Sequence, residues 1–246
     1  MKVTTTVSTR GRYFTTLPTC LIAIANQTRP PDEFILFDDN DSPQDLREIS
    51  IYKHIFNLFS TKGIEWKVIY GKRAGQVLNH QTTLELAKGD LIWRLDDDNL
   101  PQPNVLEILY NTISSNSKIG AVAGLVPPSN YNTNSLASNK IEDIFLGMNI
   151  QWFKNTGIKE VDHLYSSFIF RKEAAKHGYC LELSRIGHRE ETIFTYTMKV
   201  NGWKLFINSD AITLHFQEEG GIRSFNNIQM WKHDDNIFNN KLKICL

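Results

Sequence analysis

Three consecutive aspartates, Asp96, Asp97 and Asp98, directly follow an apolar run at residues 91–95. The run contains leucine, isoleucine and tryptophan and is typical of a buried strand. Adjacent carboxylates repel one another unless a cation relieves their charge, and Mg²⁺ and Mn²⁺ prefer oxygen ligands of this kind. Aspartate is also common in turns, and Pro101 follows closely. The triplet therefore indicates either a metal site, with substrate phosphates completing the shell, or a solvated turn.

A second acidic pair, Asp38 and Asp39, follows another strand-like run at residues 33–37. In parallel α/β sheets, ligands bind beyond the carboxyl ends of the strands. Both acidic clusters end predicted strands at that edge. Their shared position favours a binding site over the chance composition of two turns.

Strand and helix patterns alternate through the first half of the chain. Strands are predicted at residues 2–8, 33–37, 65–70, 91–95 and 119–123, and helices at residues 15–26, 43–60, 75–88 and 103–115. We expect the helix at 43–60 to begin at Ser42-Pro43, with serine as the N-cap and proline at the first helical position. This order predicts an α/β fold with a mostly parallel central sheet and helices on both faces.

The second half of the chain is less regular. It predicts a loop at residues 126–140, a strand at 164–170, a short helix at 171–176, a helix at 190–201 and short strands at 204–207 and 211–214. Asparagine is frequent near the C-terminus, which predicts an irregular or poorly packed tail.

The composition is typical of a globular protein and argues against nucleic-acid-binding and membrane-spanning classes. The 246 residues are 41% hydrophobic and 22% charged, which is typical of a globular chain. Lys plus Arg and Asp plus Glu both number 27, so there is no overall basic field and we expect no nucleic-acid partner. No apolar run approaches the ~20 residues that span a bilayer. The three cysteines show no metal-ligand spacing, and we expect a cytoplasmic location with at most peripheral contact with a membrane.

Further motifs give the chain a resemblance to a known family. Asn79 lies in a predicted helix that ends at residues 87–90, just before the strand that leads to the aspartate triplet. Residues 167–174, the pair Glu190-Glu191 and the segment Asn-Gly-Trp-Lys at 201–204 follow in order. Over about residues 3–216, this order and spacing resemble the inverting glycosyltransferases of family 2. That family has the GT-A fold and uses nucleotide-activated sugars.

The resemblance implies one GT-A domain over residues 1–246, with a Rossmann-like, mostly parallel sheet and a smaller mixed region on the acceptor side. The half of the chain at about residues 1–99 would bind the nucleotide sugar. Residues of about 100–216 would bind the acceptor and carry the catalytic group, and residues 217–246 would form a C-terminal loop and tail.

On the nucleotide side, the resemblance places Thr9 against the base and ribose. Asp39 would accept a hydrogen bond from a base N–H, which uracil and guanine both offer. Asp96 would face the ribose or bridge to the metal shell.

The opening segment at residues 7–12 departs from the family's usual turn. Arg10 and Arg12 are therefore candidates for holding the diphosphate. Arg73 is a further candidate, although with Lys72 it could equally form a solvated pair.

For the metal, the resemblance implies that Asp98 coordinates Mn²⁺ or Mg²⁺ directly. His215 stands where some members carry a histidine that binds the metal or the diphosphate, although a single histidine at a strand end is often structural. Asp97 has no clear counterpart, because the family usually has a small residue at this position. We count it among the nucleotide-sugar-binding residues, and we expect it either to share in ligating the metal or to face solvent.

Glu191 is expected to be the general base, but the family's acidic pair is usually Glu-Asp. The assignment between Glu190 and Glu191 therefore stays open. Both residues also suit the first turn of a helix, where acids complement the helix dipole.

The expected function is transfer of a sugar, with inversion, from a nucleotide-diphosphate donor, most simply a UDP-sugar, to a hydroxyl acceptor. A glycan or lipid-linked acceptor in polysaccharide or glycoconjugate synthesis is the family default. The acceptor depends on residues 125–165, which include Trp152 and Phe153, and on the tail, where Glu218-Glu219-Gly220-Gly221 could form a mobile loop. Two alternatives stay open, namely a sugar-phosphate nucleotidyltransferase, for which Thr9–Arg12 is a faint phosphate loop, and a non-catalytic binding module.

Overall fold

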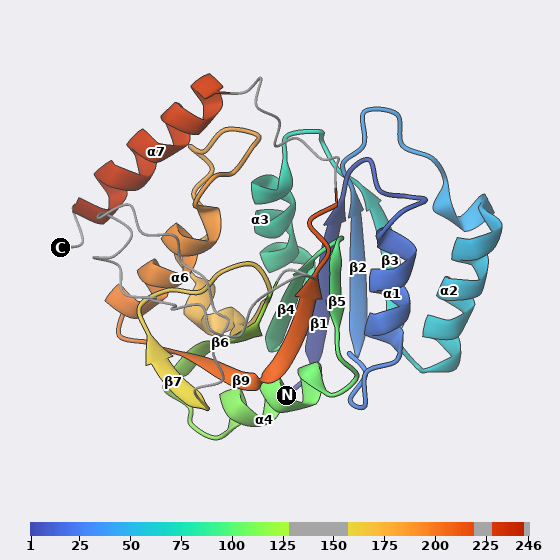
Figure 1. Ribbon diagram of the computed structural model, residues 1–246, viewed down its shortest axis with the longest axis horizontal. Helices are drawn as coiled ribbons and strands as arrows, with labels where there is room; N and C mark the ends of the chain where they lie inside the picture. The colour runs from blue at the N-terminus through green and yellow to red at the C-terminus, as the bar shows by residue number, and fades with distance from the viewer. Residues whose placement is uncertain (128–156, 219–227, 244–246) are drawn as a thin grey trace.

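Four parallel strands form the N-terminal half of a curled sheet (Figure 1). They lie in the order β3 (Glu65–Tyr70), β2 (Glu33–Asp38), β1 (Val3–Thr9) and β4 (Leu91–Asp96). The computed structural model describes residues 1–127, 157–218 and 228–243. The strands predicted in this half are confirmed, and so is the parallel arrangement.

The other half of the sheet is mixed. β8 (Phe168–Arg171) pairs antiparallel with β4 and with β6 (Ile119–Leu125), and β6 pairs parallel with β9 (Lys204–His215). β9 also pairs antiparallel with β7 (Ile158–Val161) and with β5 (Asn99–Pro101). The pairing with β5 directs the end of β9 toward the aspartate triplet.

Two apolar clusters cover the two faces of the sheet, as the alternation of side chains along a strand requires. In β4, Trp93 belongs to one cluster and Ile92 to the other. The first cluster includes residues of α1 (Leu17–Ala25), α2 (Ser50–Thr61) and α4 (Val105–Ser114). The second includes residues of α3 (Gln76–Leu86), α6 (Glu190–Val200) and α7 (Ile228–Lys243). The predicted α/β fold class is confirmed.

The predicted start of the second helix is wrong. α2 begins at Ser50, after a 3₁₀ turn at Leu46–Glu48, and Ser42-Pro43 lies outside both. Asp45 caps the 3₁₀ turn, because its carboxylate accepts a hydrogen bond from the backbone N–H of Arg47 at 3.0 Å. The extended backbone of Ile49, with φ −86° and ψ 125°, separates this turn from α2.

Two strand predictions in the second half also need correction. The predicted strand at 164–170 begins only at Phe168, because Ser166 has a left-handed φ of 56° that interrupts an extended chain. The two strands predicted at 204–207 and 211–214 are one strand, β9, with a register shift against β6. A bulge of this kind lets β9 continue as one strand, although several of its residues do not pair with β6.

The C-terminal tail was predicted to be irregular, and for residues 228–243 this is wrong. α7 spans them and packs on α6, with Phe238 and Leu242 buried. Trp152, Phe153, most of the predicted loop at 126–140 and residues 219–221 lie outside the described residues. Among the described helices, none combines the length and the apolar character that crossing a membrane requires.

Candidate active site

The ends of β1, β2 and β4 bring the acidic clusters together. In the register of the sheet, Ser8 pairs with Asp96 and Thr9 pairs with Asp38. Asp97 and Asp98 form the turn between β4 and β5. Both predicted clusters therefore lie at one edge of the sheet, as their sequence positions indicated.

Asp97 points into the segment that follows β1. Its carboxylate accepts hydrogen bonds from Thr9 Oγ1 at 2.7 Å, from Arg10 N at 3.3 Å and from the guanidinium of Arg12. The side chain is buried, and this burial raises the pKa of Asp97 to about 6 although Arg12 and Thr9 oppose the shift. Asp97 thus fixes the opening segment, and the alternative that it faces solvent is wrong.

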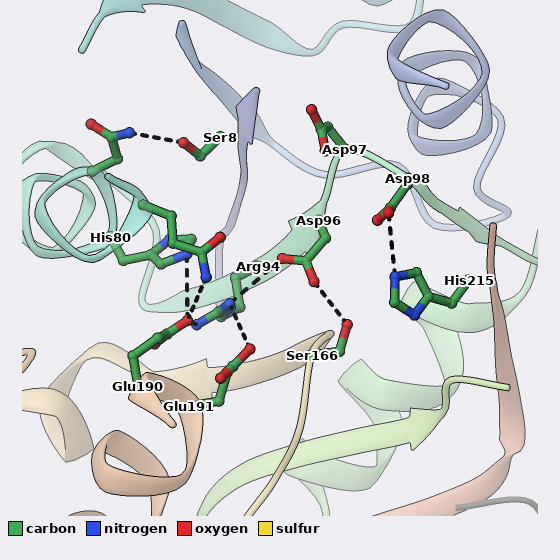
Figure 2. A network of polar contacts seen from close by, with 12 residues as sticks. Ser8, His80, Arg94, Asp96, Asp97, Asp98, Ser166, Glu190, Glu191 and His215 are labelled. Carbon is green, nitrogen blue, oxygen red and sulfur yellow. Dashed lines mark hydrogen bonds and ion pairs between the residues drawn. The ribbon is translucent and has the colours of Figure 1, made fainter. Parts of the chain in front are cut away.

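Asp98 faces β9 (Figure 2). His215 Nε2 lies 3.3 Å from Asp98 Oδ2, and the β5–β9 ladder brings the two residues together by pairing Asn99 with His215. Arg12 Nη2 lies 3.3 Å from the same oxygen. Burial alone lowers the pKa of His215, but the hydrogen bond and charge of Asp98 outweigh this effect and raise it.

The residues around Asp98 fit a divalent cation. Asp98 Oδ1 is buried and has no hydrogen-bond partner among the described residues. Such an oxygen beside an imidazole nitrogen is a suitable pair of ligands for Mn²⁺ or Mg²⁺, which commonly take one or two protein groups and fill the shell with phosphate oxygens and water. In the described part of the chain, no cluster of three or more His, Cys, Asp or Glu side chains could hold a metal ion. A cation here would depend on the donor for the rest of its ligands.

Asp39 lines a separate part of the same edge. Asp39 Oδ2 accepts a hydrogen bond from Gly75 N at 3.1 Å, whereas Oδ1 is buried without a hydrogen-bond partner among the described residues. A Cβ atom on Gly71 would lie 2.5 Å from Oδ1, so only glycine leaves room for the carboxylate in this position. An unpaired, buried acceptor of this kind suits a ligand N–H group.

The two other basic candidates point elsewhere. The guanidinium of Arg10 donates to Asp39 O at 2.7 Å and pairs with Asp41, so it holds the loop after β2. Arg73 is exposed, with a left-handed φ of 57°. Arg12 is the basic residue that the structure brings to Asp97 and Asp98.

Glu190 and Glu191 form the first turn of α6, as predicted, and both are buried against Arg94 of β4. Arg94 Nη1 donates to Glu190 Oε1 at 2.6 Å, and Nη2 lies 3.7 Å from Glu191 Oε1 (Figure 2). Burial raises the pKa of Glu190, and the charge of Arg94 opposes this shift.

Asp96 lies between the metal candidates and the two glutamates. One carboxylate oxygen accepts a hydrogen bond from Ser166 Oγ at 3.0 Å, and the other lies 3.7 Å from Arg94 Nη2. The sequence interpretation missed both Ser166 and Arg94. An arginine inside an apolar strand run was a usable signal, because a buried charge requires a partner.

A family model adds an independent line of evidence to this geometry. The model for glycosyl transferase family 2 matches residues 6–178, which is more than half of the chain. The chain belongs to glycosyl transferase family 2. This confirms the resemblance.

Solved glycosyltransferase structures share the fold of this family 2 protein. A crystal structure of GalNAc-T7 with UDP, GalNAc and Mn²⁺ aligns with a TM-score of 0.64 at 15% identity, over 88% of this chain and 44% of that chain. A crystal structure of residues 1–349 of S. aureus TarS with UDP-GlcNAc aligns with a TM-score of 0.63 at 17% identity, over 90% of this chain and 60% of that chain. This family 2 chain spans about half the length of the solved chains. Among curated proteins, a sequence search finds no match.

Proposed function

We propose that this glycosyltransferase moves a sugar, with inversion, from a nucleoside-diphosphate donor to a hydroxyl acceptor. The observation that carries the proposal is the position of Asp96. Asp96 stands between the Asp98–His215 pair and the Glu190–Glu191 pair (Figure 2). The metal candidates and the candidate bases therefore lie on either side of one carboxylate. Because GalNAc-T7 was solved with UDP and TarS with UDP-GlcNAc, we favour UDP as the nucleotide.

On the donor side, the unpaired Oδ1 of Asp39 accepts the N–H of a uracil ring. Asp96 faces the ribose, where its Ser166 contact fixes the orientation of the carboxylate. Thr9 acts through Asp97, because its hydroxyl is already donated to that residue. The division into a donor half at residues 1–99 and an acceptor half at 100–216 belongs to the same proposal.

Asp98 and His215 would hold a Mn²⁺ or Mg²⁺ ion. Such a cation stabilises the negative charge that builds up on the leaving diphosphate. Arg12 provides a permanent positive charge beside Asp97 and Asp98, and it offsets part of the negative charge of these two carboxylates.

Glu191 takes the proton from the acceptor hydroxyl as that oxygen attacks the anomeric carbon. One carboxylate base is sufficient for a single displacement, which inverts the anomeric configuration. Glu190 is less suited to this task, because its side chain is wholly buried and its Oε1 is held by Arg94 at 2.6 Å. Glu191 lies farther from Arg94 and keeps some exposure.

The two arginines of the opening segment also bear on the nucleotidyltransferase alternative. Arg10 is held by Asp39 and Asp41, and Arg12 is held by Asp97 and Asp98. A phosphate loop would need such side chains to be available to a triphosphate. Their engagement favours sugar transfer.

The proposal is tested with a panel of nucleotide sugars and Mn²⁺. Thermal shift identifies the donor, because a ligand that binds only the folded state raises its stability. Product analysis then measures transfer or donor hydrolysis by the wild type, E191Q and E190Q. We expect E191Q to keep donor binding and to lose about 10²–10⁴-fold in kcat. If no donor is turned over although one binds, the protein is a binding module, and if E191Q stays active, Glu191 is not the base.

A further inference from the structure

Arg94 carries a buried charge at the centre of the site. Its side chain has no solvent exposure, and its neighbours in β4, Trp93 and Leu95, belong to the apolar core. Its guanidinium carbon lies 5.2 Å from the centre of the Phe168 ring, which supports it by a cation–π contact. A charge in this environment persists only where carboxylates compensate it.

Three carboxylates face the guanidinium (Figure 2). Nη1 holds Glu190 at 2.6 Å. Nη2 lies 3.7 Å from Glu191 Oε1 and 3.7 Å from Asp96 Oδ1. The same nitrogen thus stands between the proposed base and the residue on the donor side. Both carboxylates lie beyond hydrogen-bond distance of this nitrogen, so it contacts them by charge alone.

The other titratable groups around the glutamates are neutral near pH 7. His80 of α3 lies 3.9 Å from Glu190, and burial together with the charge of Arg94 keeps the pKa of His80 well below its ordinary value. Tyr179 packs against His80, and burial raises the pKa of its hydroxyl. In the described part of the chain, Arg94 is the one permanent cation within 4.0 Å of either glutamate.

We infer that Arg94 is a positioning residue. It fixes the carboxylate of Glu191 relative to Asp96, and so holds the proposed base at the correct position relative to the donor. The inference rests on the proposed function. The planar guanidinium anchors one nitrogen on Glu190 and directs the other between Asp96 and Glu191, which a single ammonium group cannot do. Misplacement of a reacting group by about 1 Å can cost about a hundredfold in rate.

Glu190 has a part in this arrangement as the counter-charge. It takes up much of the positive charge of Arg94 through the short contact. Without Glu190, more of that charge would act on Glu191 and Asp96, and Glu191 would become a poorer proton acceptor. Without Arg94, Glu191 would instead face Glu190 and Asp96 with no cation between them. Removing Arg94 and removing Glu190 should therefore shift the acid limb of the pH profile of kcat/KM in opposite directions.

The test compares R94M, R94K, E190Q and the double variant R94M/E190Q with the wild type. For R94M we expect about a hundredfold lower kcat with little change in donor KM, and an acid limb of kcat/KM about one pH unit higher. For E190Q we expect the acid limb to move lower. R94K should have a kcat as low as that of R94M, because the single ammonium group of lysine cannot contact Glu190 and Glu191 in the way the planar guanidinium does.

The double variant separates positioning from folding. R94M alone leaves Glu190 buried without its partner and should unfold at a lower temperature, whereas R94M/E190Q removes both charges and should recover stability. We expect the double variant to stay slow. If it regains both stability and kcat, Arg94 has only a structural role, and the inference is overturned.

A second buried arginine provides the control. Arg171 donates to the backbone carbonyls of Ile119 and Ile113, each at 2.9 Å, and faces no carboxylate of the site. R171M should lose stability but keep the wild-type pH profile. A shift of the acid limb in R171M as large as in R94M would refute the inference. Failure of the proposed function looks different, because the wild type itself would then turn over no donor.

Discussion

Arg12 and His215 approach the same oxygen of Asp98, each at 3.3 Å, from segments that lie about two hundred residues apart in sequence. The permanent cation and the titratable ring therefore share one carboxylate. The other oxygen of Asp98, Oδ1, has no hydrogen-bond partner among the described residues. This arrangement leads to the first prediction, which concerns the metal.

Replacing Asp98 with asparagine should weaken Mn²⁺ binding in the presence of UDP by about tenfold or more, because an amide oxygen carries no charge for the cation. Calorimetric titration of Mn²⁺ measures the affinity. D90N is the matched control, since Asp90 is exposed and precedes the same strand at its opposite end. Equal Mn²⁺ affinity in D98N and the wild type would remove Asp98 from the metal site.

Replacing Gly71 with alanine should weaken nucleotide binding about tenfold. The new methyl group would lie 2.5 Å from Asp39 Oδ1 and would push this acceptor away from the base. Isothermal titration with UDP measures the effect. In the control variant G63A, the added Cβ meets no atom within 4 Å, so only the backbone strain of its φ of +74° should appear, as lower stability. Unchanged UDP affinity in G71A would place the base elsewhere.

Replacing Asp234 with alanine should cost about 1–3 kcal/mol in the free energy of unfolding. Asp234 of α7 is fully buried and accepts hydrogen bonds from Ser184 N at 2.7 Å, Ser184 Oγ at 2.9 Å and His188 N at 2.8 Å. Its loss would leave these donors unpaired in the loop that leads to Glu190. Denaturant titration measures the cost.

Activity should fall together with stability in D234A, because the same loop places the start of α6. D235A is the matched control on the same helix, since Asp235 is partly exposed and only pairs with His188. Its cost should stay below about 1 kcal/mol. Similar losses in the two variants would mean that the hydrogen bonds of Asp234 stabilise the fold no more than the partly exposed pair of Asp235 does.

His163 should make the protein sensitive to acid. Burial lowers the pKa of His163 from 6.5 to about 4. Between these values the unfolded chain binds a proton that the folded chain does not, so stability falls as the pH falls. Acidification from pH 7 to pH 5 should cost the folded state about 2 kcal/mol through this residue.

The variant H163Q should therefore lose less free energy of unfolding than the wild type between the two pH values, as denaturant titration at each pH would measure. The exposed His54 provides the control H54Q, which should behave like the wild type. An identical pH dependence in H163Q and the wild type would contradict the prediction.

The sequence alone was sufficient for the fold class and the family, because both depend on local patterns. Apolar runs such as residues 91–95 end in charged residues, and each run is short enough to be a strand. The order of strands and helices then requires parallel pairing and places Asp38, Asp39 and the triplet at one edge of the sheet. Chain order likewise placed Glu190 and Glu191 at the start of a helix.

Only the tertiary structure decided which charges meet. Asp97 and Asp98 are neighbours in sequence, yet one binds Thr9 while the other faces His215. Arg94 reaches Glu190 across 96 positions of the chain. Strand register, burial and the packing of α6 against the sheet set these contacts, and a linear pattern contains no record of them. The same packing favours Glu191 over Glu190 as the base, a choice that the sequence left open.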